Sequence, residues 1–128
     1  MANYISAKQP QMTDLVLYHN PRCSKSRSAL ALIEQRGLAP TVIRYLETPP
    51  SPSELERILA RLRIAPRQLL RTGEDEYTSL GLADPSMSDA QLIEAMVAHP
   101  RLIERPILVA GNNAVIGRPP EKVLELLP

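Results

Sequence analysis

The sequence predicts an α/β fold in which helices cover a four-stranded mixed sheet, and three features of the pattern lead to this prediction. Two short apolar runs, at 15–19 and 41–46, flank a stretch with helical spacing, which is the order of a parallel strand–helix–strand unit. A later apolar run, 107–116, is interrupted by a Gly-Asn-Asn turn, which indicates a β-hairpin. The region between, about 51–104, has helical patterns and helix-start signals only.

The parallel strand–helix–strand unit has the clearest local sequence signals in the chain. Residues 15–19 read LVLYH and are followed by an Asn-Pro turn signal, as expected for a short buried strand. From Cys23 the apolar positions recur at helical spacing until Gly37, where a helix would stop. Residues 41–46 read TVIRYL and form the second strand. Because the connections are short, we expect parallel strands joined by a right-handed crossover.

The region of about 51–104 is expected to be a helical insertion. Its first helix begins at a capping box, SPSE at 51–54, with proline in the first helical position. A short helix is predicted near 66–71, and a second capping box, SDAQ at 88–91, starts another helix that ends before Pro100. After the hairpin, a last helix is expected from about Pro120 to Leu127.

This element order is that of a thioredoxin-like fold. We expect residues 1–12 to be a loose N-terminal tail and residues 13–128 to form one thioredoxin-like domain that contains the insertion. A folded monomer of 128 residues buries roughly 67% of its extended surface, which is enough for a core without disulfides or metals. We expect a monomer.

Composition excludes several classes of protein. One cysteine rules out an internal disulfide framework and a cysteine-rich zinc site. The two histidines are far apart in sequence, so the sequence does not favour a metal centre built from histidines. A net charge of +1 gives no broad electrostatic reason to bind nucleic acid or a membrane surface. No apolar run approaches the ~20 residues that span a bilayer, and the first twelve residues lack the apolar core of a secretion signal. We therefore expect a cytoplasmic protein.

Cys23 is the candidate nucleophile. It opens the first predicted helix, where the helix dipole and unpaired N–H groups favour a thiolate over a thiol. His19, Lys25 and Arg27 are close in sequence and would act in the same direction, although His19 could equally be an ordinary strand-end side chain. A helix N-terminus is also a site for anions. A reactive sulfur and an anion site are therefore predicted at the same place.

Arginine dominates the basic residues, with twelve Arg against three Lys. Its planar fork of donors suits tetrahedral oxyanions and carboxylates. Arg105 precedes Pro106 at the start of the third strand, which in a thioredoxin-like fold is the place of a cis-proline loop facing the cysteine. Arg118 precedes the last helix, and Arg71 ends a short one. Spacing alone leaves open whether these three arginines converge or lie on the surface as solvated charges.

Six segments together resemble the glutaredoxin-coupled arsenate reductase family. In order they are YHNPRCSKSR, YLETPPS, LLRTGEDEY, LGLAD, ERPILV and IGRPPEKVLELL. The resemblance runs from Leu15 to Leu127. It implies a thioredoxin-like fold with a helical insertion. One departure is the pair Ser24-Lys25, which stands where typical reductases of the family have Gly-Thr.

The resemblance also implies roles for individual residues. Cys23 matches the family's nucleophile, and three arginines match its oxyanion-binding set, namely Arg71, Arg105 and Arg118. His19 and Ser26 match the residues that favour the thiolate.

The implied reaction is the reduction of arsenate to arsenite. Reduction takes two electrons, and a chain with one cysteine cannot supply them by forming an internal disulfide, so an external thiol is required. In the family this co-substrate is glutathione, and glutaredoxin resolves the mixed disulfide. No bound cofactor and no metal are called for.

Other functions are weighed against this one. A redox-sensing regulator that binds RNA polymerase would use a Cys-x-x-Cys switch, whereas positions 23–26 read CSKS. A monothiol glutaredoxin that binds an iron–sulfur cluster would use one cysteine, but neither the insertion nor the arginines fit it. A low-molecular-weight phosphatase needs a C-x5-R loop, and here only three residues separate Cys23 from Arg27. A thiol oxidoreductase of the same family that acts on another substrate stays open.

Overall fold

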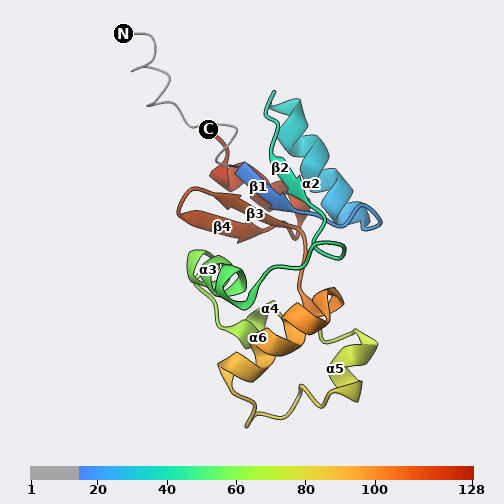
Figure 1. The fold of residues 1–128 in the computed structure, drawn as a ribbon. Coiled ribbons are helices and arrows are strands. Elements are labelled where there is room, and N and C mark those ends of the chain that lie inside the picture. Colours follow the sequence, from blue (N-terminus) through green and yellow to red (C-terminus); the bar gives the residue numbers. More distant parts are fainter. Residues whose placement is uncertain (1–14) are drawn as a thin grey trace.

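The computed structural model describes residues 15–128, so the predicted tail at residues 1–12 lies outside the described residues. The described chain forms a four-stranded mixed sheet of strand order β2-β1-β3-β4, with helices on both faces (Figure 1). The predicted α/β class and mixed sheet are confirmed. The arrangement is a thioredoxin-like fold.

The strand–helix–strand unit comprises β1 (Leu15–Tyr18), α2 (Ser24–Gln35) and β2 (Thr41–Ile43). The strands β1 and β2 are parallel, as predicted, and pair from Val16↔Thr41 onward. The strand predicted over 41–46 is too long. It ends at Ile43 because the chain turns at once, with the N–H of Glu47 donating to the carbonyl of Arg44 at 2.9 Å. The turn brings the following residue, Tyr45, into the core, where it is 2% exposed.

The hairpin consists of β3 (Ile107–Ala110) and β4 (Asn113–Ile116). It is antiparallel, and β3 also pairs antiparallel with β1. The predicted three-residue turn is one residue too long, because Asn113 already pairs with Ala110 in the ladder. Gly111 has φ +60°, a left-handed conformation that glycine adopts without a steric penalty.

The regular elements between β2 and β3 are all helices, joined by turns and loops. Its elements are α3 (Pro52–Leu62), α4 (Pro66–Leu69), α5 (Asp75–Ser79), α6 (Asp89–Ala98) and the 3-10 helix η2 (Pro100–Leu102). The sequence did not predict α5. The last element, η3 (Pro120–Leu126), is a 3-10 helix, whereas the sequence indicated only a helix.

The two predicted capping boxes have different outcomes. The box at Ser88 and Gln91 is complete, with both side chains bonded to the reciprocal backbone N–H. At Ser51 the side chain accepts from the N–H of Glu54 at 3.1 Å, but Glu54 does not reach back. Its carboxylate instead accepts a hydrogen bond from the hydroxyl of Tyr18 at 2.6 Å, so the reciprocal half of that box is wrong.

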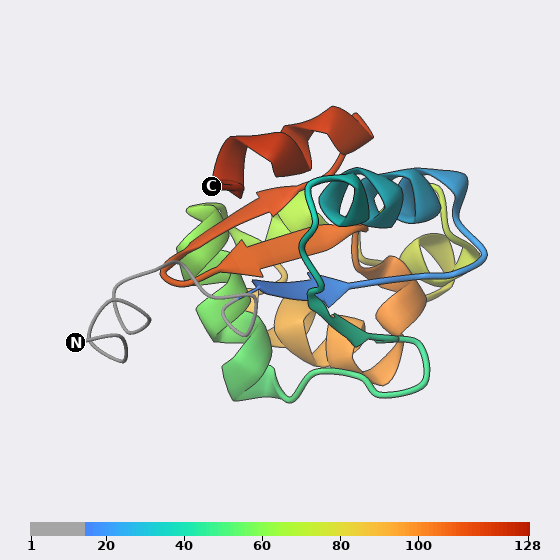
Figure 2. The same cartoon turned by 90° about the horizontal axis from the view of Figure 1, so that it is seen from above.

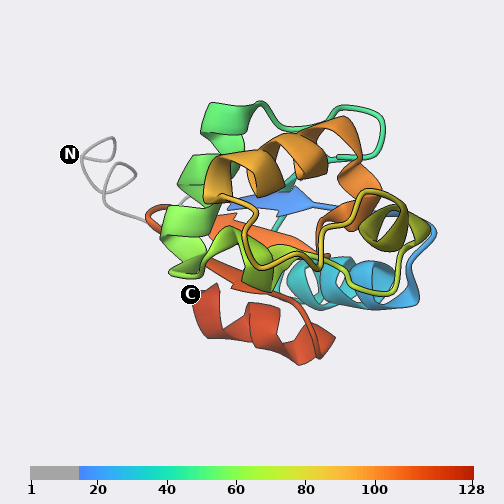
Figure 3. The same ribbon diagram turned by 90° about the horizontal axis from the view of Figure 1, so that it is seen from below.

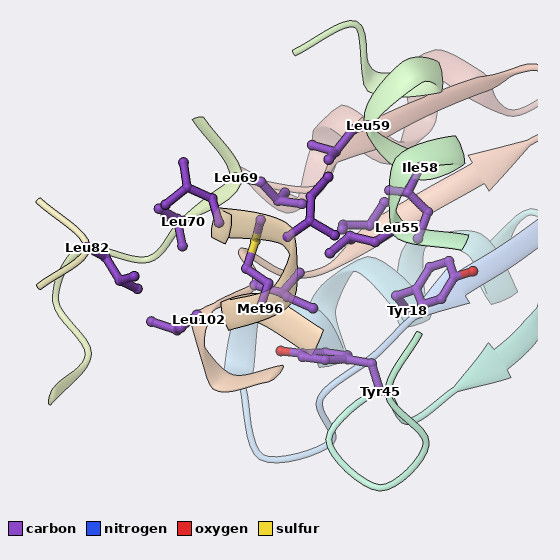
Figure 4. Packing of buried hydrophobic residues seen from close by; sticks show 14 of the residues in the cluster. Tyr18, Tyr45, Leu55, Ile58, Leu59, Leu69, Leu70, Leu82, Met96 and Leu102 are labelled. Carbon is purple, nitrogen blue, oxygen red and sulfur yellow. The ribbon is translucent and has the colours of Figure 1, made fainter. Parts of the chain in front are cut away.

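Side chains alternate along the strands and divide the core into two layers. Figures 2 and 3 show helices on both faces of the sheet. Leu17 and Leu108 pack with α2 and η3 on one face of the sheet. Tyr18 and Ile107 pack with α3 and α6 on the other face, in the cluster drawn in Figure 4. This second cluster joins the sheet to the helical segment without a break. Among residues 15–128, no helix is long and apolar enough to cross a membrane.

Candidate functional site

Cys23 lies at the junction of β1 and α2, as predicted. It is the N-cap residue of α2, with extended backbone, and its carbonyl accepts the first helical hydrogen bond from the N–H of Arg27 at 3.0 Å. Its side chain makes no capping hydrogen bond, and the first turn of α2 contains no acidic residue. The thiol is half-buried. The positive end of the helix dipole is therefore not neutralised by a carboxylate of its own helix.

Cys23 opens into a surface pocket of about 460 Å³. Two of the three arginines predicted from the sequence, Arg71 and Arg105, line this pocket together with the cysteine. Arg118 does not line it. The full lining consists of polar and charged residues with two hydrophobic ones: Asn20, Arg22, Cys23, Tyr45, Leu46, Arg71, Glu74, Arg101 and Arg105.

Backbone pairing inside the helical segment brings the first arginine to the pocket. An isolated antiparallel bridge joins Leu70 to Ile103. Next to it, the N–H of Arg71 donates to the carbonyl of Leu102 at 2.8 Å. This bridge places Arg71 beside the chain that runs directly into Arg105, although the two are far apart in sequence.

The other two arginines precede prolines, and both Arg105-Pro106 and Arg118-Pro119 are cis peptide bonds. The first is the cis-proline loop that the sequence predicted before the third strand. The two loops are tied together by a hydrogen bond of 2.8 Å from the N–H of Gly117 to the carbonyl of Pro106. Arg105 and Arg118 are thereby neighbours, and a guanidinium N–H of Arg118 donates to the carbonyl of Arg105 at 3.3 Å.

The three arginines converge on one carboxylate. The Oε1 atom of Glu104 lies 3.5 Å from Nε of Arg71, 3.6 Å from Nε of Arg118 and 3.7 Å from Nη1 of Arg105. Convergence, which spacing left open, is therefore a property of the fold. Arg118 takes part in the cluster through Glu104 although it does not line the pocket at Cys23.

Arg105 is the least satisfied member of the cluster. Its side chain is 14% exposed, and its buried Nε and Nη1 atoms have no hydrogen-bond partner among the described residues. A buried donor without an acceptor is costly, and a buried cationic one more so. The part of Arg105 that remains exposed lines the pocket, and an arginine guanidinium is well suited to an oxyanion ligand.

His19 and Ser26 contact each other at the end of β1. Nδ1 of His19 lies 2.7 Å from Oγ of Ser26, and both residues are buried. Burial, and next the charges of Arg44 and Arg27, hold the pKa of His19 below its usual value. A neutral imidazole does not attract a thiolate as a cation would. At neutral pH His19 therefore supplies no positive charge to Cys23, and its observed contact is with Ser26, in the first turn of α2. Its role in favouring the thiolate stays a prediction.

With this geometry established, comparison with known proteins identifies the family. The ArsC family model matches residues 18–126, which is most of the chain. The chain belongs to the ArsC family.

Individual ArsC relatives agree over nearly the full length. The chain is 45% identical over 117 residues to an arsenate reductase of Neisseria meningitidis serogroup A, which covers 91% of this chain and 100% of that protein. It is 52% identical over 112 residues to the uncharacterized protein YfgD of Escherichia coli (strain K12), covering 87% and 94%. The structure of an arsenate reductase from Vibrio cholerae superimposes with a TM-score of 0.87 at 53% identity, covering 88% and 97%.

Sequence reasoning missed several residues of this ArsC pocket. Glu74 bonds to Arg71 and pairs with Arg101 at 2.8 Å, and the bond from Arg71 is the main reason why the pKa of Glu74 is lowered. Tyr45 lines the pocket, and burial raises the pKa of its phenol. The third omission, Glu104, belongs to the arginine cluster and does not line the pocket. The two glutamates look like solvated surface charges, so only the LLRTGE and ERP segments of the resemblance could have pointed to them, and only YLETPPS to Tyr45.

Proposed function

We propose that this ArsC protein reduces arsenate to arsenite, with the thiolate of Cys23 as the nucleophile. The observation that carries the proposal is that Cys23 shares one pocket with Arg71 and Arg105. The two arginines in the pocket lining support a tetrahedral oxyanion as the ligand, because guanidinium groups bind oxyanions well. The arsenate reductases among the similar proteins support arsenate as that oxyanion.

The first step joins sulfur to arsenic. The Cys23 thiolate attacks As(V), an S–As bond forms, and one arsenate oxygen leaves as hydroxide, which takes up a proton to become water. Arsenic remains As(V) at this point. Negative charge builds on the arsenate oxygens during the attack, and the guanidinium groups stabilise it in a partly buried site.

The second step transfers the electrons. The sulfur of a glutathione thiol attacks the sulfur of Cys23, the S–As bond breaks, and its electron pair goes to arsenic, which leaves as arsenite. The thiol proton is retained in the arsenite. The two sulfurs are thereby oxidised to a mixed disulfide on Cys23. Glutaredoxin then removes the glutathione by thiol–disulfide exchange and restores the Cys23 thiolate.

A coupled assay tests the proposal. The purified protein is incubated with arsenate, glutathione, glutaredoxin, glutathione reductase and NADPH, and both NADPH oxidation and arsenite formation are followed. We expect NADPH oxidation that depends on arsenate and on glutaredoxin, and its loss in Cys23→Ser. Phosphate in place of arsenate should support none, because it is not reduced. Arsenite formation by Cys23→Ser at the wild-type rate would overturn the proposal.

A further inference from the structure

Glu104 is the centre of the arginine cluster, yet it is set apart from the pocket. It does not line the pocket at Cys23. It lines a small apolar cavity together with Tyr18 and Tyr45. The carboxylate is therefore not among the groups that border the space a ligand would take beside Cys23.

The carboxylate is fixed in place by backbone contacts. The N–H of Glu104 donates to the carbonyl of Leu69 at 2.9 Å, beside the Leu70–Ile103 bridge. The Oε1 atom also accepts from the N–H of Arg105 at 3.2 Å. One oxygen atom thus faces three guanidinium groups from a position that the fold determines.

The contacts hold the guanidinium groups and leave a donor of Arg71 available. Arg71 directs Nε to Glu104 and Nη1 to Glu74, and Arg118 directs Nε to Glu104 and Nη1 to the carbonyl of Arg105. Within residues 15–128, the Nη2 group of Arg71 makes no hydrogen bond, and Arg71 lines the pocket at Cys23. The cluster is held by Glu104 and keeps a donor of Arg71 for a ligand.

We propose that Glu104 is the positioning residue of the oxyanion site, which rests on the function proposed above. Three like charges within a few ångströms repel one another, and their long side chains would separate into solvent without a shared counter-charge. The carboxylate holds them together before the oxyanion arrives. The ligand then binds to a cluster that is already assembled and does not have to order it.

The test replaces the carboxylate by an amide of the same shape. In Glu104→Gln, inorganic phosphate serves as a non-reducible probe, and its binding is measured by how well it protects Cys23 from alkylation. We expect the phosphate concentration for half-protection to rise about tenfold or more, as typically follows loss of a residue that orients ligating groups. The matched control is Glu47→Gln, because Glu47 pairs only with Arg44, at 3.9 Å between exposed side chains.

A double-mutant cycle separates positioning from a general structural effect. If Glu104 organises the arginines, Arg118→Ala should weaken phosphate protection less in the Glu104→Gln background than in the wild type. Additive losses, unchanged protection or tighter phosphate binding in Glu104→Gln would each overturn the proposal.

A measurement on the wild-type protein does not depend on any variant folding. The Nε–H signals of Arg71 and Arg118 should exchange slowly with water in nuclear magnetic resonance spectra, unlike that of the exposed Arg57. Rapid exchange at both would contradict side chains held in ion pairs with Glu104. If phosphate and arsenate fail to protect wild-type Cys23 at all, the oxyanion site itself is refuted and this role of Glu104 with it. Protection of the wild type with no effect of Glu104→Gln refutes only the role of Glu104.

Discussion

Nδ1 of His19 lies 2.7 Å from Oγ of Ser26, and this contact joins the end of β1 to the first turn of α2 beside Cys23. The same Oγ accepts a hydrogen bond from the N–H of Asn20 at 3.0 Å. Because the Ser26 oxygen already accepts from Asn20, the Ser26 hydroxyl can donate its own proton to Nδ1 of a neutral His19. The contact is compatible with an unprotonated imidazole, while burial, and next the charges of Arg44 and Arg27, lower the pKa of His19.

Burial of His19, and next the charges of Arg44 and Arg27, make protein stability depend on pH. The unfolded chain binds a proton on His19 near the ordinary pKa of 6.5, whereas the folded protein takes it up only at lower pH. Stability is therefore fully present above pH 6.5 and falls as the pH drops toward the folded pKa, by at most about 1.4 kcal/mol per pH unit. Urea unfolding measured from neutral pH down to about pH 5.5, above the range of the carboxylates, checks this expectation.

The variant that tests this expectation is His19→Gln, which should flatten the dependence of the free energy of unfolding on pH in this window. A wild-type free energy of unfolding that is constant through the window would contradict a neutral, buried His19.

A second prediction concerns the contact between β1 and α3. Tyr18 is 7% exposed, and its hydroxyl donates to the Glu54 carboxylate at 2.6 Å. Burial, and then this bond to Glu54, raise the pKa of Tyr18. Tyr18→Phe should lower the free energy of unfolding by about 1–2 kcal/mol, because a half-buried carboxylate loses a hydrogen bond. Chemical denaturation measures the difference. Tyr77→Phe is the control, since that hydroxyl makes no hydrogen bond to the described residues, and equal losses in both would refute the argument.

Gly117 controls how closely the two arginine-bearing loops approach each other. A Cβ atom there would lie 2.9 Å from Cγ of Pro106 and 3.1 Å from Cγ1 of Val123. Gly117→Ala should therefore displace the loop of Arg105 and weaken oxyanion binding, as well as lower the melting temperature. Gly73→Ala is the control, because nothing lies within 4 Å of the added carbon. Unchanged phosphate protection of Cys23 in Gly117→Ala would show that the loops can accommodate the methyl group.

Local patterns were sufficient to predict the frame of the fold. The strand at 15–18, the hairpin and the placement of Cys23 at the start of α2 each follow from residues within a few positions of one another. Predictions failed where distant contacts decide the outcome. Glu54 does not complete its capping box because its carboxylate accepts a hydrogen bond from the hydroxyl of Tyr18, 36 residues away.

The candidate site was likewise predicted only in part from the sequence. The resemblance named the arginines, but their convergence depends on the Leu70–Ile103 bridge and on two loops joined through Gly117. None of these contacts has a local signal in the sequence. Glu104 was missed for the same reason, because only the folded chain places it among three guanidinium groups.

The most discriminating prediction concerns those guanidinium groups. Replacing Arg71, Arg105 or Arg118 by alanine should lower arsenate turnover, since losing one donor to a developing oxyanion typically costs about 10² to 10³ in rate. Replacement by lysine keeps the charge but loses the fork of donors, so partial activity should remain. The coupled NADPH assay measures each variant.

The control for these variants must replace an arginine that makes no structural contact. Arg57 on α3 is exposed and suits this purpose, so Arg57→Ala should retain wild-type turnover. Arg61, on the same helix, is unsuitable because its Nε donates to the carbonyl of Gly111 at 3.1 Å. Small and equal losses at Arg57 and at the three clustered positions would mean that the cluster does not touch the reacting oxyanion. Catalysis would then depend on Cys23 and the helix N-terminus alone.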